Sequence, residues 1–596
     1  MDLTPVSPVS MASRMAIELE KLDTTVPFRA SQTYIHHTWA RTFHSRPELY
    51  IRPQTLPEIQ KIVTLARRMR RRIVVVGCAH SPSDLTCTSA WMVNLDDFAS
   101  VLKVDKSKKT LLVQAGMRLH NLNLSAKKHG LTMRNLGSID EQSIAGAIAT
   151  ATHGSSTRHG LLAQSVKSLR IVMANGQSVK CSKEQNEEIF RAALVSLGAL
   201  GIVVEVEFEM IDASDIEWVQ TILPTSTVLR DWEQDLWTQK EYTRVWWMPY
   251  MKRAIVWRAE KTTKPPRAPA YNWYGGGVGY HTYHILLWAS QYVPRLLPWV
   301  EWFVFGMQYG FKDGFTISAV EELRTGLLMN CLYSQFVNEW ALPLHKGPEA
   351  LTRLTDWLHG DQEGSGIPFS PKGLWVHSPI EVRVSDTTSA DPRPYLDNTV
   401  KDGPTLYLNA TLYRPYGQDP PCLARYYEAF EWLMREMGGR PHWAKNFTSQ
   451  ISYEVLDSMY GDDLQAYLRI RNEVDPEGMF VGEWHRRTIL PPKSVFPALA
   501  LEEKEVIRRP HTGGGGGIDW VGEQARWWDG GIDMSSSGRS ESEESFDLMH
   551  GAEAEASVLL ESLREDMEDE EMEGLLGRTH GNPVEGWSGT NVFDKM

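Results

Sequence analysis

Apolar residues follow two different periods along the first third of the chain. From residue 59 to residue 69 they recur at helical spacing, and the preceding Thr55, Pro57 and Glu58 are typical of a helix start. The continuous apolar run of residues 73–76, which ends at Gly77, predicts a buried strand. The same rules predict further strands over residues 50–51, 92–95, 110–114, 168–173 and 202–210, and helices over residues 118–128 and 187–197. This mixture indicates an α+β domain over residues 45–212.

A second region, from about residue 213 to residue 490, has longer and more aromatic strands. Residues 244–249 and 253–258 predict a hairpin, and residues 375–384 and 405–413 alternate polar with apolar side chains. A helix is expected over residues 425–437, before a glycine pair. The length of 596 residues with 42% hydrophobic content is sufficient for two substantial cores. We therefore expect an α+β protein with two domains, over residues 45–212 and 213–490.

The two ends of the chain differ from these domains in composition. Residues 1–27 show no strong periodicity, and we expect a flexible leader there. Residues 500–596 contain a glycine run and a Ser/Glu-rich stretch, which predict a disordered acidic tail. Within it, residues 541–573 hold 14 Asp and Glu against the single Arg564, a charge of -13 that equals the formal charge of the whole chain. The rest is therefore close to neutral, which argues against a basic nucleic-acid surface.

Cysteines and apolar stretches restrict the cellular setting. Five scattered cysteines, none in a C-x-x-C pair, argue against a disulfide framework or a zinc site and fit a reducing compartment. The N-terminal segment lacks the apolar core of a secretory signal, so secretion is not expected. The most apolar stretch, residues 285–305, is interrupted by prolines and charged residues and does not predict a spanning helix. Its three tryptophans leave two alternatives, an interfacial patch on a membrane or a helix pair packed within the second domain.

The first candidate for chemistry is the loop after the buried strand at residues 73–76. Its residues are Gly77, Cys78, Ala79, His80, Ser81 and Pro82. Successive backbone N–H groups in a loop of small residues can bind phosphate oxygens without any basic side chain. An ordinary turn with a surface histidine is the alternative, and this motif alone does not decide between them.

The second candidate is the segment 135–154, which reads NLGSIDEQSIAG and continues to THG. Ser138 and Glu141 are spaced as in a capping box, which predicts that a helix rich in small residues begins there. The N–H groups and dipole of a helix N-terminus suit a diphosphate. A well-capped, tightly packed helix without a ligand is the alternative.

The third candidate combines two motifs of the second region. Glu381 and Arg383 lie two residues apart on a predicted strand, so their side chains project from the same face. A surface ion pair is the alternative. The sequence His-Trp-Ala-Lys at residues 442–445 follows the glycine pair. The glycine run 275–279 does not fit G-x-G-x-x-G, follows no convincing buried strand and is not expected to open a helix, so a Rossmann site is not predicted.

Over roughly residues 27–490 these motifs resemble the vanillyl-alcohol-oxidase superfamily of flavoproteins, and within it the fungal D-arabinono-1,4-lactone oxidases. In that family the first loop reads GSGHSPS and its histidine is bonded to the 8α carbon of FAD. The match places this histidine at His80, with Cys78 and Ala79 where the family has Ser and Gly. The second segment resembles NLGSISEQSVAG…THG, and residues 198–202 resemble the segment beside the adenine and ribitol. The E-x-R pair, the HWAK sequence and residues 475–480 (DPEGMF) resemble the substrate domain.

The resemblance implies a PCMH-type FAD-binding domain followed by a mixed α/β substrate domain that caps it. It implies a covalent 8α-histidyl FAD and the following FAD contacts: Gly77, Cys78, Ala79, His80, Ser81, Pro82, Gly137, Ser138, Ser143, Gly146, His153, Gly154 and Ile202. It further implies a mitochondrial membrane location with peripheral attachment; a cytoplasmic location is the alternative. No partner of the acidic tail is implied.

The implied reaction is the oxidation of D-arabinono-1,4-lactone at C2 by O2, which gives dehydro-D-arabinono-1,4-lactone (D-erythroascorbate) and hydrogen peroxide. Glu381 would bind the C2 hydroxyl and assist removal of its proton, while Arg383 holds that carboxylate ionised. Lys445 would stabilise the reduced flavin or an oxyanion. Gly137 favours an oxidase, since the plant dehydrogenases of this group have alanine there. The alternatives are a lactone dehydrogenase that reduces cytochrome c, an alditol or carbohydrate oxidase, and a non-catalytic flavoprotein scaffold.

Overall fold

A computed structural model describes residues 11–274, 276–329, 333–377, 379–448 and 450–492. The predicted acidic tail over residues 500–596 lies outside the described residues. The prediction of a flexible leader is wrong for residues 11–20, which form helix α1 (Met11–Glu20). Met15 and Leu19 of α1 pack against the core beneath helix α2. Their spacing of four residues places both side chains on one face of the helix, a signal too short to stand out in the sequence.

The first sheet has four strands in the order β1-β4-β6-β5. Strands β4 (Leu49–Ile51), β6 (Trp91–Asn94) and β5 (Ile73–Val76) are parallel, and β1 (Ala30–Ser31) is antiparallel to β4. Helix α2 (Leu56–Met69) connects β4 to β5 and begins as predicted, with the Thr55 side chain accepting a hydrogen bond from the Glu58 backbone N–H. The loop that carries His80 therefore starts at the carboxyl end of a buried parallel strand.

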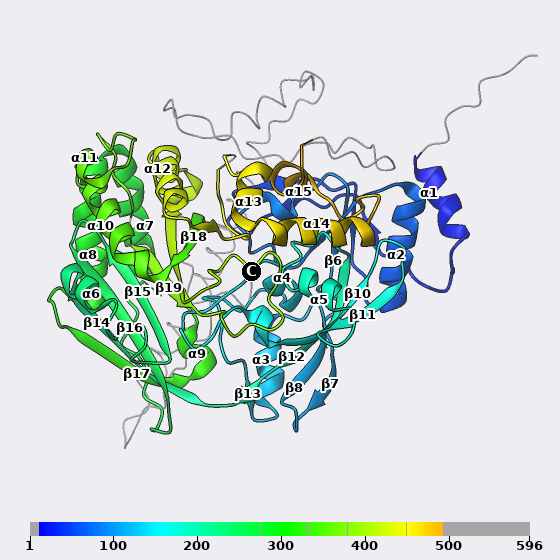
Figure 1. The fold of residues 1–596 in the computed structure, drawn as a ribbon, viewed down its shortest axis with the longest axis horizontal. Coiled ribbons are helices and arrows are strands. Elements are labelled where there is room, and N and C mark those ends of the chain that lie inside the picture. The colour runs from blue at the N-terminus through cyan, green and yellow to red at the C-terminus, as the bar shows by residue number, and fades with distance from the viewer. Residues whose placement is uncertain (1–10, 275, 330–332, 378, 449, 493–596) are drawn as a thin grey trace, which may run out of the picture. The chain divides into compact units, whose positions relative to one another are not determined.

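The second sheet has five antiparallel strands in the order β11-β10-β12-β8-β7. The strands are β7 (Val101–Asp105), β8 (Thr110–Gln114), β10 (Val166–Val172), β11 (Ser178–Ser182) and β12 (Ile202–Glu209). Helices α3 (Leu119–Lys127), α4 (Ile144–Ala149) and α5 (Glu187–Ala193) contribute to the same core, and Figure 1 shows them beside this sheet. The alternation of buried and half-buried residues along β12 matches the predicted pattern.

The third sheet has eight strands in the order β17-β14-β16-β15-β19-β20-β18-β21. The strands are β14 (Asp215–Pro224), β15 (Tyr242–Met248), β16 (Arg253–Thr262), β17 (Thr316–Glu322), β18 (Gln335–Pro343), β19 (Ile380–Ser385), β20 (Thr405–Tyr413) and β21 (Arg440–Pro441). Neighbouring strands of this sheet pair antiparallel in the described part of the chain, and β15 with β16 forms the predicted hairpin. Helices α7 (Gly277–Tyr292) and α8 (Leu297–Tyr309) pack on β14, β15 and β16 through an aromatic-rich cluster (Figure 1).

This arrangement confirms the α+β prediction and corrects three details of it. Helix α4 begins at Ile144 with Ser143 at its N-cap, so Ser138 does not cap it. Strand β19 begins at Ile380 and is shorter than the predicted 375–384. The glycine run at 275–279 does lead into a helix, because α7 begins at Gly277. The first two sheets come from residues 30–209 and the third from residues 215–441, and we retain the boundaries 45–212 and 213–490 as a proposal.

Candidate functional site

The loop from Gly77 to Pro82 holds its histidine in a shielded position. The His80 ring stacks on Trp39, with ring centroids 5.0 Å apart and an angle of 23° between the planes. Burial, together with the positive charges of Arg118 and Lys445, lowers the pKa of His80 to about 3. The imidazole is therefore neutral, and its free lone pair is available to form a bond.

Ala79 takes a left-handed backbone conformation, with φ of 54°. Glycine adopts this region without penalty, whereas the Cβ of alanine meets the following carbonyl. The loop nevertheless forms, and the carbonyl of Ala79 accepts a hydrogen bond of 2.8 Å from the Trp39 backbone N–H. The departure from the GSGHSPS pattern therefore falls on a position where glycine has a physical advantage.

The next segment approaches this loop closely. A Cβ on Gly77 would lie 2.5 Å from Ser143 Oγ, so a larger residue at this strand end would require the Ser143 side chain to move. Two side-chain atoms here are buried without a hydrogen-bond partner among the described residues, Asn135 Nδ2 and Gln142 Oε1. Such orphaned polar atoms require a polar ligand or water. A polar ligand bound beside this loop would supply the missing hydrogen-bond partners.

Several predicted FAD contacts have other surroundings. The Ser138 hydroxyl lies toward the third sheet and accepts a hydrogen bond from Arg383 Nη2. A Cβ on Gly137 would be 3.4 Å from Thr152 Cγ2, which is ordinary contact, and a Cβ on Gly146 would be 3.1 Å from Ser143 Oγ. The side chain of Ile202 is fully buried in the hydrophobic core, so it offers only its backbone to a ligand.

Glu381 and Arg383 project from the same face of β19, as the alternation of the strand predicts. Arg383 Nη2 donates to Glu381 Oε2 at 2.6 Å, and the two side chains are 8% and 13% exposed for Arg383 and Glu381 respectively. The alternative of a surface ion pair is therefore wrong, because β19 lies between β15 and β20 in the interior of the sheet. Glu381 Oε1 is buried without a hydrogen-bond partner among the described residues, and so can accept from a substrate hydroxyl.

The HWAK sequence follows β21 and turns toward the His80 loop. The Trp443 indole donates to the Leu396 carbonyl at 2.7 Å, and Asn446 Nδ2 donates to the Pro82 carbonyl at 3.0 Å. The second bond ties Asn446 to the loop of the histidine, although 364 positions separate Asn446 from Pro82 in the sequence, and the first bond holds Trp443 on the connection between β19 and β20. Lys445 lies between the two anchors, with its ammonium 3.5 Å from Glu339 Oε2.

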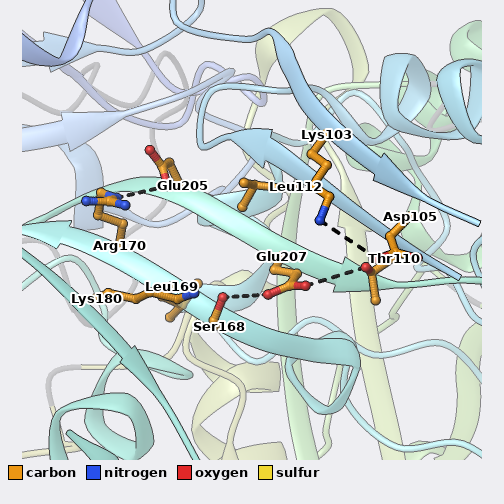
Figure 2. Close-up of a pocket in the computed structure, with 10 residues that line it drawn as sticks. All are labelled: Lys103, Asp105, Thr110, Leu112, Ser168, Leu169, Arg170, Lys180, Glu205 and Glu207. Carbon is orange, nitrogen blue, oxygen red and sulfur yellow. Dashed lines mark hydrogen bonds and ion pairs between the residues drawn. The ribbon is translucent and has the colours of Figure 1, made fainter. Parts of the chain in front are cut away.

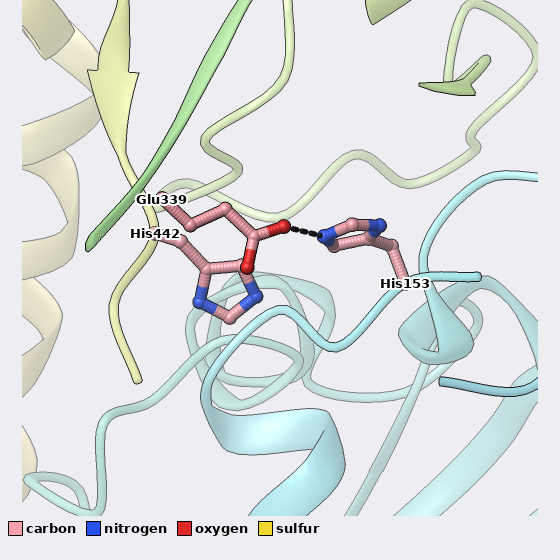
Figure 3. Close-up of side chains that lie close together, drawn as sticks. All are labelled: His153, Glu339 and His442. Carbon is pink, nitrogen blue, oxygen red and sulfur yellow. Dashed lines mark hydrogen bonds and ion pairs between the residues drawn. The ribbon is translucent and has the colours of Figure 1, made fainter. Parts of the chain in front are cut away.

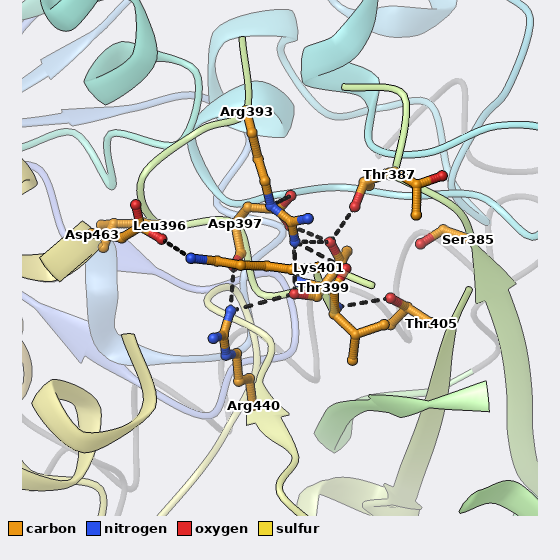
Figure 4. A network of polar contacts seen from close by, with 12 residues as sticks. Ser385, Thr387, Arg393, Leu396, Asp397, Thr399, Lys401, Thr405, Arg440 and Asp463 are labelled. Carbon is orange, nitrogen blue, oxygen red and sulfur yellow. Dashed lines mark hydrogen bonds and ion pairs between the residues drawn. The ribbon is translucent and has the colours of Figure 1, made fainter. Parts of the chain in front are cut away.

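A polar network holds the connection between β19 and β20 against β21, next to the HWAK sequence (Figure 4). Arg393 forms an ion pair of 3.0 Å with Asp397 and donates to Thr399, while Arg440 donates to the carbonyls of Asp397 and Thr399. The connection between β19 and β20 is thereby fixed against β21. Because Leu396 belongs to this connection, the network also fixes the indole that orients the HWAK turn.

The sequence prediction missed three residues at this site. Glu339 on β18 and His153 form a buried contact beside His442 (Figure 3). Arg118 contributes to the electrostatic field at His80. Arg244 is fully buried and near Glu381 and Arg383; burial and the charge of Arg383, opposed by the charge of Glu381, lower its pKa to about 9. No local pattern marks these residues, because their partners come from distant strands and loops.

A polar pocket on the five-stranded sheet is a separate feature (Figure 2). Its acidic groups are already paired: Glu205 with Arg170 at 2.9 Å and Glu207 with Ser168 at 2.8 Å. None of the predicted site residues lines it. It therefore gives no reason to move the candidate site from the region between His80 and β19.

Comparison with known proteins agrees with this geometry. A family described as D-arabinono-1,4-lactone oxidase matches residues 206–488, and one described as FAD binding domain matches residues 47–182. A Neurospora crassa protein is 51% identical over 86% of this chain and 96% of its own length, and the D-arabinono-1,4-lactone oxidase of Yarrowia lipolytica is 41% identical over 76% and 96%. The chain belongs to the D-arabinono-1,4-lactone oxidase family. Its N-terminal part is accordingly an FAD-binding domain.

Solved structures give the same fold. The cholesterol oxidase of Brevibacterium sterolicum superimposes with a TM-score of 0.65 over 82% of this chain and 100% of its own, at 14% sequence identity. A structure described as a solvent-stable cholesterol oxidase gives a TM-score of 0.61 over 77% of this chain and 97% of its own, at 15% identity. These likenesses bear on the fold alone, and they confirm the predicted α+β architecture.

Proposed function

We propose that this chain uses FAD to oxidise an aldono-1,4-lactone, D-arabinono-1,4-lactone in the first place, at C2 with O2 as the acceptor. The observation that carries the proposal is the buried Glu381–Arg383 pair: Glu381 Oε1 has no hydrogen-bond partner among the described residues, and Arg383 also donates to Ser138 of the expected FAD-binding segment. The pair thus joins a candidate base on β19 to the segment that is expected to hold the flavin. Bound FAD would supply the acceptor for the hydride from C2 and the route of the electrons to O2, with hydrogen peroxide as the product.

The residues of the chain then have distinct tasks. Glu381 Oε1 accepts the hydrogen bond of the C2 hydroxyl and receives its proton as the C–H bond breaks. Arg383 holds the other carboxylate oxygen at 2.6 Å, which fixes the carboxylate and keeps it ionised until the proton arrives. The ammonium of Lys445, whose charge also acts on His80, stabilises the reduced flavin or an oxyanion that forms in the reaction.

The test uses a panel of sugar lactones and alditols with purified yellow protein. Oxygen consumption and peroxide formation are measured for each compound. Glu381→Gln and Arg383→Ala should each lower lactone turnover by about 10²-fold or more while the flavin stays bound, because one lost transition-state contact has about that effect. Glu205→Gln, which breaks the comparable ion pair with Arg170 on the second sheet, is the matched control and should turn over normally. Full activity of both site variants would refute the proposal.

A covalent bond between His80 and the 8α carbon of FAD is the finer part of the proposal. The neutral imidazole supports it, since a protonated ring has no lone pair to offer. The stack on Trp39 limits rotation of the ring. Wild-type protein denatured in acid or detergent should keep its flavin fluorescence on a gel, and His80→Ala should lose it. Complete release of flavin from denatured wild-type protein would show that the cofactor is held without a bond.

Peripheral contact with a membrane, the mitochondrial membrane by family likeness, is a further part of the proposal. Among the described residues no helix combines the length and apolar character that crossing a bilayer needs. Helices α7 and α8 instead expose Trp288, Trp299 and Trp302, at 38%, 50% and 44%. Amphipathic rings of this kind favour the headgroup region. Sedimentation with anionic vesicles should decrease when the three are replaced by Gln, and equal sedimentation would refute this contact.

A further inference from the structure

Glu339 lies at the centre of a buried charge cluster that the catalytic roles above do not use. It is on β18, and its side chain is 3% exposed. Across the sheet it lies opposite Asn409 of β20, which in turn lies opposite Glu381 of β19. Directly opposed residues share a face of the sheet. Glu339 is therefore in the same row as the proposed base, two strands away.

Both oxygens of the Glu339 carboxylate have fixed partners. Oε1 is 3.0 Å from His153 Nε2, and Oε2 accepts from Asn409 Nδ2 at 3.2 Å. These partners are themselves held in place. Thr411 donates to Asn409 at 2.7 Å, and the His153 ring stacks on Tyr407 at 3.5 Å with 8° between the planes. The carboxylate consequently has one orientation.

His153 reinforces the negative charge of this carboxylate. Its second nitrogen, Nδ1, lies 2.9 Å from the Gly154 carbonyl, so an acceptor oxygen faces each ring nitrogen. Burial alone would raise the pKa of Glu339, but the charge of Lys445 and the His153 hydrogen bond outweigh it and place the pKa well below the usual range. Glu339 is thus an anion.

The ammonium of Lys445 is 3.5 Å from Oε2 of this fixed anion, and this is its only ion pair within the described part of the chain. A lysine stem has four rotatable bonds, so an ammonium without a partner samples many positions. We propose that Glu339 is the positioning residue for Lys445: the carboxylate, held by His153 and Asn409, keeps the ammonium aimed at the flavin loop. The inference rests on the proposed function, because that function gives Lys445 its task.

A divalent cation held by His153, Glu339 and His442 is the competing interpretation, since their ligand atoms lie within 4.8 Å of one another (Figure 3). Two contacts favour the positioning role. The ammonium of Lys445 already offsets the carboxylate, and His442 Nδ1 already accepts from the Ala444 backbone N–H at 3.2 Å. A further cation between these groups would meet the ammonium at short range.

The reduction potential of the flavin in the purified holoenzyme tests the inference, because a positioning role and no positioning role for Glu339 shift this potential in opposite directions. A positive charge near the flavin stabilises its reduced form, so Lys445→Met should lower the potential. If Lys445 leaves its position in Glu339→Gln, the potential of that variant should also fall below wild type. It should then equal the potential of the double variant Glu339→Gln/Lys445→Met, because the lysine charge is absent from the site in both proteins. If Lys445 stays, removal of a negative charge should raise the potential instead, and the inference is wrong.

Further variants test whether the position of the Glu339 carboxylate matters and whether the loss of any buried glutamate has the same effect. Glu339→Asp keeps the charge but withdraws the carboxylate, so it should lower the potential only if position matters, and an unchanged potential contradicts the inference. Glu431→Gln, at another buried glutamate that bonds to Asn338 and Thr448, is the matched control and should leave the potential unchanged. We also expect Glu339→Gln to slow flavin reduction by lactone roughly 10- to 100-fold, as displacements of about 1 Å can do.

Three other results would have separate meanings. One equivalent of a divalent metal in the holoenzyme, lost in Glu339→Gln, would replace the inference with the metal site. If Lys445→Met leaves the potential unchanged and wild-type protein oxidises no lactone, the proposed function itself fails. A third result is that lactone is oxidised and Lys445→Met lowers the reduction potential, but Glu339→Gln raises the reduction potential. In that case only the positioning role of Glu339 is refuted.

Discussion

Replacing Ala79 by glycine should stabilise the protein, because it removes a methyl group from a left-handed backbone position. The φ of Ala79 is 54°. An L-residue in this region costs about 1–2 kcal/mol, and glycine escapes that cost. Glycine in turn loses about 0.5–1 kcal/mol through the greater freedom of its unfolded chain. The difference leaves a gain in the free energy of unfolding of about 0.5–1 kcal/mol.

The assay is urea unfolding of the two proteins, followed by intrinsic fluorescence with the flavin state matched. A thermal scan is less informative, since a gain of this size moves the melting temperature of so long a chain by only about 1 °C. Ala466→Gly is the matched control. Ala466 lies inside helix α14 (Asp462–Val474) with ordinary helical backbone, so the same substitution should destabilise there by about 0.5–1 kcal/mol.

Opposite signs for the two substitutions are the expected result. If Ala79→Gly destabilises as Ala466→Gly does, the Ala79 methyl makes contacts worth more than its backbone strain, and the reasoning is refuted. The comparison also bears on the cofactor. Should His80 carry the flavin equally well in the wild-type protein and in the Ala79→Gly variant, the strain in the loop affects stability and not the attachment.

Three further predictions follow from other parts of the molecule. Gly137→Ala should preserve flavin reduction by lactone but slow flavin reoxidation by O2, because the added Cβ fits at 3.4 Å from Thr152 Cγ2 yet narrows the path of O2 to the flavin. Equal rates of reoxidation in stopped flow would show that Gly137 does not control access of O2. Burial raises the pKa of Glu431 from 4.5 to about 7. Its protonated carboxyl therefore contributes at most about 3 kcal/mol to the free energy of unfolding below pH 4.5, and this contribution is lost as the pH rises through 7. In Glu431→Gln, the free energy of unfolding measured in urea should depend less on pH over this range. Truncation after residue 500 should leave activity and melting temperature nearly unchanged, and a large drop in either would show that the acidic tail docks on the body.

Local patterns predicted the elements that depend on local physics. Helix α2 begins at its Thr55 cap, and strand β8 occupies the predicted residues 110–114. The capping box at Ser138 was predicted from the same rules and is wrong. Its hydroxyl bonds instead to Arg383, which is 245 residues away, and no local rule contains that competitor. Helix α4 consequently begins later than the capping box would indicate, after Ser143.

The candidate site likewise has features that local patterns predict and features that depend on distant residues. Strand alternation correctly predicted that Glu381 and Arg383 share a face, but it could not predict burial, which depends on β19 being an interior strand. The motif at residues 442–445 indicated Lys445, yet the partner that orients its ammonium comes from β18. Glu339 has no sequence signal of its own, since its contact with His153 joins residues 186 positions apart.

The charges on this face of the sheet also argue for proton removal as the chemistry. Glu381 and Arg383 offset each other, and so do Glu339 and Lys445. Arg244 remains, buried beside the first pair and still protonated at neutral pH, since its lowered pKa is about 9. An excess of positive charge in a buried site favours a substrate that loses a proton and becomes more negative as it reacts. Arg244→Met should therefore raise the pH at which lactone oxidation begins, whereas a site that only binds neutral sugar would keep the same pH profile.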